Sequence, residues 1–277
     1  MNAELCWDGL RMDIPHAMEP AVLDRGFIRL AGPGQPAIDL RFGMERGQFD
    51  PKRDGLRILK ASGLEHEILE PAHEPWNREL KGDLYSCGRL HVLRFRETRC
   101  VVAALFSTPP PPGMVRGMMA SLAWTSPENW RTWRCYDLEF ETPPHFTLTK
   151  AVFRPGRFHL GFARGRSGVS LDRLAPANVL LADATLDSWV GRFAQREHGC
   201  ELAVALLDEE HAEFSRRPGM MRTILPWLPG IAPHIRGLVR HDALHNKILV
   251  LTERGRPSPQ PIFERMYSSY ATTTIQN

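Results

Sequence analysis

Three histidines and an aspartate near the C-terminal end form the densest group of residues that could bind a metal or move a proton. They are His234, His241, Asp242 and His245, residue types that coordinate zinc or serve as general acid and base. Their spacing disfavours both roles, because in a strand His241 and His245 would lie about 13 Å apart at ~3.3 Å per residue. We interpret the group as the solvated end of a β-hairpin.

A histidine and two cysteines form the other mixed group, of a kind that could supply a nucleophilic Cys–His pair. They are His91, Cys87 and Cys100. A hairpin that turns at residues 98–99 would place His91 and Cys100 on different rungs of the ladder, so they would not be cross-strand neighbours. We therefore interpret Cys100 as a small buried apolar residue.

The motifs of nucleotide-binding and hydrolytic enzymes do not occur in this sequence. It contains no G-x-x-x-x-G-K-[ST], G-x-G-x-x-G, G-x-S-x-G or H-E-x-x-H. The five cysteines are scattered and never in C-x-x-C spacing, which is typical of reduced cytosolic thiols rather than of a disulfide framework or a zinc site. These absences favour a non-enzymatic protein without deciding the question, and the sequence identifies no catalytic residue, metal ligand or cofactor site.

Three arginines alternate with apolar residues in predicted strands, at Arg29, Arg41 and Arg157. Gathered on one sheet face, they would form an anion-binding surface for phosphates or an acidic partner. Asp39 and Asp172 share that parity and would dilute the charge, so an ordinary charged solvent face is the simpler interpretation. The chain has 30 arginines against five lysines, which fits the codon bias of a GC-rich genome as well as a role in anion contacts.

A dense apolar group in the irregular stretch 216–233 is the candidate partner surface. Its members are Met220, Met221, Leu225, Trp227 and Leu228. Methionine and tryptophan are enriched at protein interfaces, but the same residues would suit a loop packed over its own sheet. Both interpretations stay open.

The elements that position these residues follow a pattern that occurs twice. Residues 21–30, AVLDRGFIRL, align without a gap to residues 151–160, AVFRPGRFHL, with identical Ala, Val, Gly and Leu. Upstream of each window an alternating strand ends at proline, at Leu10–Pro15 and Leu138–Pro143. Alternation continues downstream, which predicts that each half opens with about three half-buried strands.

The later elements match between the halves as well. Predicted helices at 51–62 and 184–198 are each followed by a glycine suited to the left-handed C′ position, Gly63 and Gly199. Each half continues with a strand (64–69, 200–207), a hairpin (89–106, 235–251) and a proline-led helix (114–123, 262–270).

The resulting order is βββ-α-βββ-α, twice, so we predict an α+β fold with mostly antiparallel sheets and flanking helices. The apolar runs Val101–Phe106 and Ile248–Leu251 lack alternation. This predicts that both are central strands, covered on both faces.

The two copies are predicted to be tandem repeats joined by a short segment. We place the first repeat at 1–124, a Trp-rich junction at 125–133 and the second repeat at 134–277. Trp124, Trp130 and Trp133 lie at this junction, and we expect their large rings to pack where the repeats meet.

The opening strand of the first half has the pattern L-x-M-x-x-P, from Leu10, Met12 and Pro15. This strand and the order of elements in each half faintly resemble the Mog1/PsbP-like proteins. The resemblance implies an α/β/α sandwich and a small binding or assembly module rather than an enzyme.

Charge and hydropathy narrow the class of protein further. A net charge of +3 over 277 residues gives no strong attraction to nucleic acid or anionic lipid. The sequence has no signal-peptide pattern and no apolar run long enough to span a bilayer. We therefore predict a cytoplasmic monomer or homodimer without membrane association.

The leading functional prediction is a non-enzymatic protein-binding or assembly module whose partner is another protein. A first alternative is an enzyme or small-ligand binder with a cleft between the two repeats, where His159, His241 or Arg29 would be the polar groups. A second alternative is nucleic-acid or anion binding through the arginine-bearing sheet faces.

Overall fold

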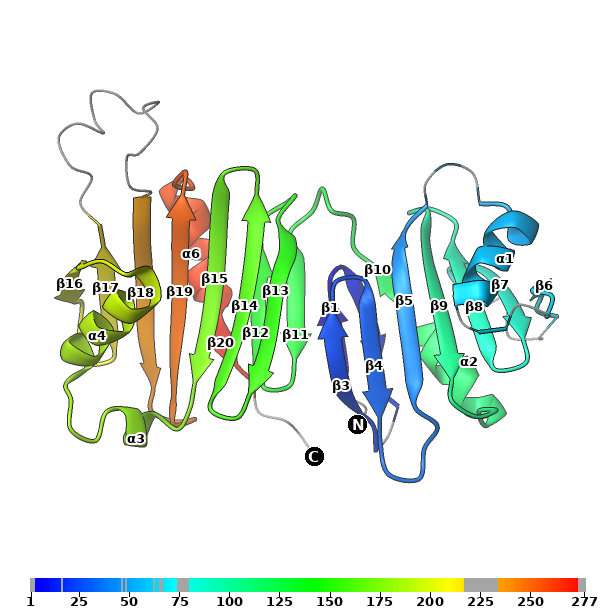
Figure 1. The fold of residues 1–277 in the computed structure, drawn as a ribbon, viewed down its shortest axis with the longest axis horizontal. Helices are drawn as coiled ribbons and strands as arrows, with labels where there is room; N and C mark the ends of the chain where they lie inside the picture. Colours follow the sequence, from blue (N-terminus) through cyan, green and yellow to red (C-terminus); the bar gives the residue numbers. More distant parts are fainter. Residues whose placement is uncertain are drawn as a thin grey trace. The chain divides into compact units, whose positions relative to one another are not determined.

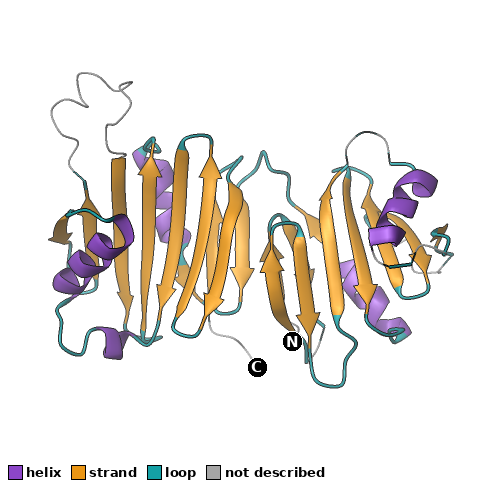
Figure 2. Ribbon diagram, viewed as in Figure 1, coloured by secondary structure: helices purple, strands orange, loops and turns teal. Residues whose placement is uncertain are grey.

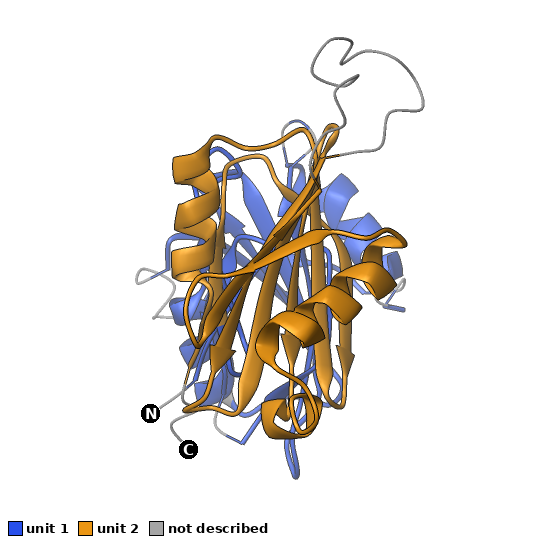
Figure 3. Cartoon of the chain, turned by 90° about the vertical axis from the view of Figure 1, so that its left-hand side faces the viewer, with its two compact units in different colours: residues 1–138, 274–277 blue, residues 139–273 orange. Residues whose placement is uncertain are grey.

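The computed structural model describes residues 3–15, 17–45, 47, 49–61, 63–64, 67–73, 80–216 and 234–273 (Figure 1). This part of the chain divides into two compact units, the first ending at Leu138 and the second running from Glu139 to Thr273 (Figure 3). The division lies later than the predicted junction at 125–133. The reason is that β11 (Arg131–Cys135) pairs with β1 (Glu4–Trp7), at the start of the chain.

The larger sheet of the first unit has seven strands in the order β3-β4-β5-β9-β8-β7-β6, and all neighbours are antiparallel. Its strands are β3 (Glu19–Asp24), β4 (Phe27–Ala31), β5 (Ile38–Met44), β6 (Glu70–Pro71), β7 (Gly82–Cys87), β8 (Leu90–Phe95) and β9 (Cys100–Phe106). Side chains alternate between the two faces of a strand. Along β5, Ile38 and Leu40 are therefore buried on one face while Arg41 is exposed on the other.

The larger sheet of the second unit also has seven strands, in the order β13-β14-β15-β19-β18-β17-β16, again antiparallel throughout. Its strands are β13 (Thr147–Arg154), β14 (Arg157–Arg164), β15 (Ser167–Leu174), β16 (Ala203–Leu206), β17 (His211–Ser215), β18 (His234–Asp242) and β19 (Lys247–Gly255). The first strand of each sheet contains a bulge, after Pro20 in β3 and after Leu148 in β13. The two sheets thus share their strand order and an irregular first strand.

Shorter strands complete each unit. In the first unit, β2 (Leu10–Asp13) pairs with β1 on one side and with β10 (Ala123–Trp124) on the other. In the second unit, β12 (Leu138–Thr142) pairs with β20 (Ala271–Thr272).

The described helices begin and end close to where proline and glycine predict (Figure 2). They are α1 (Pro51–Ala61), α2 (Pro112–Ser121), α3 (Ala177–Leu180), α4 (Leu186–His198) and α6 (Gln260–Ser269). Helix α4 ends at Gly199, which has a left-handed backbone with φ of 65° and donates its N–H to the carbonyl of Gln195. Among the described residues, no helix has both the length and the apolar character needed to cross a membrane.

Helices cover both faces of the sheet in the second unit. Leu186, Val190 and Phe193 of α4 are buried in one cluster with Val239 and Ile248 of the sheet. On the opposite face, α6 packs its Phe263 ring under the guanidinium of Arg236, 4.0 Å away. Figure 1 shows α4 in front of this sheet and α6 behind it.

These elements confirm an α+β fold with mostly antiparallel sheets and flanking helices. The predicted number of strands was wrong, because five strands, β1 to β5, precede α1 where about three were expected, and β12 to β15 precede α3 in the second unit. The repeated window at 21–30 contains the turn between β3 and β4, so a tight turn was hidden inside one apolar pattern. The strand predicted at 64–69 is also displaced, since β6 covers only Glu70–Pro71.

Candidate functional site

A cavity of about 570 Å³ opens in the first unit between α1 and the larger sheet. Its floor consists of Leu90 from β8 and Val101, Ala103 and Leu105 from β9. These β9 residues are two apart, so they point to the same face of the sheet. Ile58 of α1 forms part of the wall, and the resulting site is apolar at its base.

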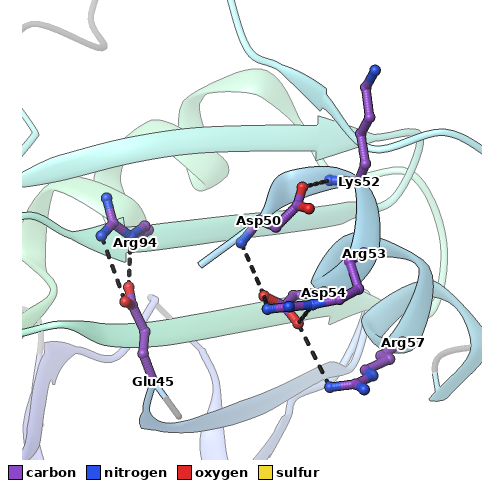
Figure 4. A network of polar contacts seen from close by, with 7 residues as sticks. All are labelled: Glu45, Asp50, Lys52, Arg53, Asp54, Arg57 and Arg94. Carbon is purple, nitrogen blue, oxygen red and sulfur yellow. Dashed lines mark hydrogen bonds and ion pairs between the residues drawn. The ribbon is translucent and has the colours of Figure 1, made fainter. Parts of the chain in front are cut away.

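Helix α1 is fixed at its start by reciprocal capping, shown in Figure 4. The carboxylate of Asp50 accepts a hydrogen bond of 2.9 Å from the backbone N–H of Lys52, while the N–H of Asp50 donates to the carboxylate of Asp54, also at 2.9 Å. Only Gly55 and Leu59 of this helix are buried. The helix therefore contacts the sheet along a narrow line and leaves the cavity beside it.

Three carboxylates line the cavity, and each is already paired with an arginine. The pairs are Asp39 with Arg29 at 2.6 Å, Glu45 with Arg94 at 2.5 Å, and Asp54 with Arg53 at 3.0 Å. Figure 4 shows the last two pairs. The hydrogen bond from Arg53 lowers the pKa of Asp54, and the side chain of Glu45 is only 3% exposed. These acids therefore add little free negative charge to the site.

Two arginines at the rim keep their full charge. No carboxylate among the described residues forms an ion pair within 4.0 Å of Arg41 or Arg25, although Arg25 interacts electrostatically with Asp8. The Arg41 guanidinium lies over the Phe27 ring, 5.3 Å from its centroid, which holds the charge beside the cavity mouth. The site thus combines an apolar floor with positive charge at its edge.

The side chains that line the cavity are those of apolar residues, arginines and paired carboxylates. Within the part of the chain that the structure describes, no histidine or cysteine lines the cavity. No group of three or more His, Cys, Asp or Glu residues in that part could hold a metal ion. The floor and the rim can bury apolar groups and can donate charge-assisted hydrogen bonds from guanidinium to an anionic group.

The sequence-predicted partner surface at Met220, Met221, Leu225, Trp227 and Leu228 lies outside the described residues. Of the predicted junction tryptophans, Trp133 is fully buried with its ring centroid 5.2 Å from that of Trp7, and Trp124 lies 6.1 Å from Phe42. Trp130 is half-buried. Their packing where the repeats meet stays a prediction.

The histidine group closes a hairpin turn. The ring Nδ1 of His245 lies 2.9 Å from the carboxylate of Asp242 at the tip between β18 and β19. In the other mixed group, His91 pairs in register with Ala104 rather than with Cys100. The structure thus brings together neither a metal site nor a Cys–His pair from these residues.

The arginines of the predicted anion-binding face differ in their partners. Arg29 and Arg157 are paired with carboxylates, Arg157 with both Asp172 at 2.7 Å and Glu197 at 2.8 Å. Asp39 and Asp172, which we expected to dilute the positive charge of this face, are therefore the ion-pair partners of Arg29 and Arg157. Arg41 is the exception, and it lies at the cavity rim.

Sequence reasoning missed the cavity because it predicted β9 to be covered on both faces. The corresponding run of β19 is covered on both faces, since Ile248 and Val250 are fully buried. In β9, by contrast, Val101 and Leu105 are only partly buried. One signal was present: β9 has the small Ala103 where β19 has Ile248. A residue that is smaller than its counterpart in the other unit indicates that the space next to it is less completely filled.

The chain was compared with protein-family models, curated proteins and solved structures. No protein-family model matches the chain, and no curated protein matches it. A crystal structure of the Saccharomyces cerevisiae Ran-binding protein Mog1p is similar with a TM-score of 0.35 and 9% identity, covering 52% of this chain and 96% of that one. A mutant form of the protein Mog1 gives a TM-score of 0.36 and 8% identity, covering 53% and 97%. The faint Mog1-like resemblance, over about half of the chain, is confirmed.

Proposed function

We propose that this chain is a non-enzymatic binding module built from two tandem copies of one unit, and that the α1 cavity is where the first copy binds a partner protein. The shared strand order of the two larger sheets supports the duplication. A cytoplasmic location is part of the proposal, supported by the scattered, odd-numbered cysteines.

The observation that carries the binding role is the combination of an apolar floor with unpaired positive charge. Val101 and Leu105 offer apolar surface that the protein leaves partly uncovered, next to the fully buried Leu90. Arg25 and Arg41 stand at the rim without an ion pair to a carboxylate within 4.0 Å among the described residues. A partner segment that inserts one large apolar side chain and carries Asp or Glu next to it would satisfy both features.

A peptide-display selection with the full chain as bait tests this proposal. We expect the enriched peptides to carry acidic residues beside Leu, Ile or Phe. Ala103→Trp fills the floor of the cavity, and Arg41→Glu reverses the charge at its rim. Each variant should lower the affinity for the selected peptides about tenfold or more, which for Arg41→Glu is the loss expected for a charge-assisted contact. Affinities are measured by fluorescence anisotropy with synthetic copies of the enriched peptides.

Arg116→Glu is the matched control, since it makes the same charge reversal at an exposed position on α2, away from the cavity. It should leave peptide affinity nearly unchanged. The proposal fails if no acidic-apolar preference emerges, or if the Ala103→Trp variant binds the selected peptides as tightly as the wild-type chain.

The volume of the cavity favours a second candidate, a small-ligand binder. About 570 Å³ falls in the range of ~300–1,000 Å³ that is usual for small-molecule sites. Octanoate, with an apolar chain and one carboxylate, is a suitable probe by isothermal titration calorimetry. Octanoate binding that Ala103→Trp abolishes, together with no selected peptide, would favour this candidate over the first, and absence of both would remove the cavity as a binding site.

A further inference from the structure

A second cavity, of about 460 Å³, lies in the second unit on the sheet face that carries α4. Its floor is made of small residues, because Gly161 of β14 pairs with Ser170 of β15, which in turn pairs with Thr252 of β19. Gly168 also lines the floor. The hollow exists because four adjacent positions carry no large side chain.

Gly161 keeps this floor open. A Cβ atom at this position would lie 3.3 Å from the hydroxyl of Thr149 and 3.8 Å from Nε2 of His159. The hydroxyl and the imidazole nitrogen therefore lie over the same patch of backbone. Any side chain at position 161 would occupy the space that these two polar atoms border.

A buried carboxylate sets the orientation of His159. Nδ1 of His159 lies 3.0 Å from the carboxylate of Asp172, whose side chain is 4% exposed. That carboxylate also accepts a hydrogen bond of 2.8 Å from Nε of Arg157. An ionised carboxylate only accepts hydrogen bonds, so Nδ1 of His159 carries the proton and Nε2 is left to face the cavity.

The charges around the cavity favour an anion. Arg157 is held between Asp172 and Glu197, and these three side chains together carry one net negative charge. Lys150 and Arg254 also line the cavity, and no carboxylate among the described residues pairs with either. His198 adds no repulsion or attraction of its own at neutral pH, because burial and the nearby Arg254 lower its pKa.

The donors that converge on this cavity are of the kinds that bind phosphate. Lys150 and Arg254 supply positive charge, and Thr149, Ser170 and Thr252 supply hydroxyl groups. Phosphate oxygens accept several hydrogen bonds at once, and charge-assisted bonds from arginine and lysine are the strongest of them. We infer that the cavity lined by Lys150, His159 and Arg254 binds the phosphate group of a small phosphorylated ligand.

This inference is independent of the proposed function, because it concerns a different cavity in the other unit. The test is titration of the full chain with inorganic phosphate and with phenyl phosphate, followed by ³¹P NMR line broadening and by calorimetry. Saturable binding of both probes would support a phosphate site. Binding of phenol as tight as that of phenyl phosphate would overturn the inference, since the ring rather than the phosphate would then be recognised.

Variants separate a specific site from general charge attraction. Arg254→Gln and Lys150→Gln each remove one rim cation and should weaken phosphate binding about tenfold. Gly161→Val fills the floor and should abolish binding without a change of charge. Circular dichroism and thermal unfolding confirm that each variant is folded, and Gly161→Ala serves as a milder substitute if valine prevents folding.

Arg164→Gln is the matched control, because Arg164 lies on the same strand as His159 but is exposed and does not line the cavity. It should leave phosphate affinity unchanged within about twofold, after allowance for salt screening. If Arg164→Gln weakens binding as much as Arg254→Gln does, or if the wild-type chain binds no phosphate at millimolar concentration, the inference is wrong.

Discussion

Helices α1 and α4 follow corresponding strands of two sheets with the same strand order, yet they cover those sheets to different depths. Helix α1 buries only Gly55 and Leu59, whereas α4 buries five residues, among them Trp189 and Phe193. The strand beneath α1 keeps partly exposed apolar residues, while Ile248 beneath α4 is fully buried. The same sheet pattern therefore supports an open site in one unit and a filled core in the other.

Side-chain volume and one inserted turn of helix account for this difference. Arg41 pairs with Ala103 in the first unit, and Leu174 pairs with Ile248 at the corresponding rung of the second. A charged and a small residue thus stand where the second unit has two large apolar ones. The second unit also inserts α3, whose Ala177 is fully buried in the same cluster as Leu174.

The difference also determines where each unit is hollow. In the first unit the cavity lies toward the end of β5, next to Arg41, because little fills that region. In the second unit that region is packed, and the hollow lies toward the glycines and Ser170, on the other side of Asp172. The two units thus have cavities of different chemistry, one with an apolar floor and one with a floor of small and polar residues.

The largest effect is expected from Trp189→Ala in α4. The indole is 7% exposed and stacks on Phe193 with centroids 5.2 Å apart. Its removal leaves a cavity in a filled core and should lower the free energy of unfolding of the second unit by about 3–5 kcal/mol. Urea denaturation followed by circular dichroism measures the change.

Leu56→Ala is the control for this prediction, since Leu56 on α1 is 60% exposed. It should change stability by less than about 0.5 kcal/mol, as surface substitutions do. Similar losses for both variants would mean that α1 and α4 are equally embedded, contrary to the comparison.

A smaller loss of stability is expected from Asp172→Asn. The change keeps the size of the side chain but removes the charge that holds Arg157 and His159, and the group is almost fully buried. Leaving buried donors with a weaker acceptor should destabilise the second unit by about 1–3 kcal/mol. Asp39→Asn in the first unit, whose partner Arg29 is half exposed, should have a clearly smaller effect in the same denaturation assay. Equal effects would show that the two pairs are equally buried.

Acid should weaken the second unit through Glu197 on α4. The hydrogen bond from Arg157 lowers the pKa of Glu197. A carboxylate whose pKa is lower in the folded state stabilises the protein above its unfolded pKa, about 4.3 for Glu, and this contribution is lost as the pH falls through the folded value. Thermal unfolding measured from pH 6 down to about pH 3 should therefore show a steeper loss for wild type than for Glu197→Gln. Parallel profiles would contradict the pairing.

Much of this fold could be predicted from local sequence patterns. The two cavities depend on strand register and on helix depth, which such patterns do not contain. Helix α4 and the β18–β19 hairpin were predictable because each carries a long, regular signal with a glycine or turn at its end. The two-residue β6 carries no such signal, so the strand in this region was predicted at 64–69 instead of at Glu70–Pro71. The pairing of His159 with Asp172 needs the register between two strands, and the α1 cavity needs the depth at which a helix sits. Neither quantity is encoded in the periodicity of a single segment.

The smallest effect is expected from Ala103→Ile, which gives the first unit the residue that the second has at position 248. Ala103 lines the cavity but is only 7% exposed and belongs to a buried cluster with Leu59 and Val92. We expect the added methylenes to enter the cavity beside this cluster. The free energy of unfolding should change by less than about 1 kcal/mol, whereas adding similar volume to a well-packed core costs about 1–3 kcal/mol. Val250→Phe in the fully buried β19 is the overpacked counterpart, and both are measured by urea denaturation. If Ala103→Ile destabilises the chain as much as Val250→Phe does, the space beside α1 is not open in solution, because only a site without neighbouring atoms accepts volume at so little cost.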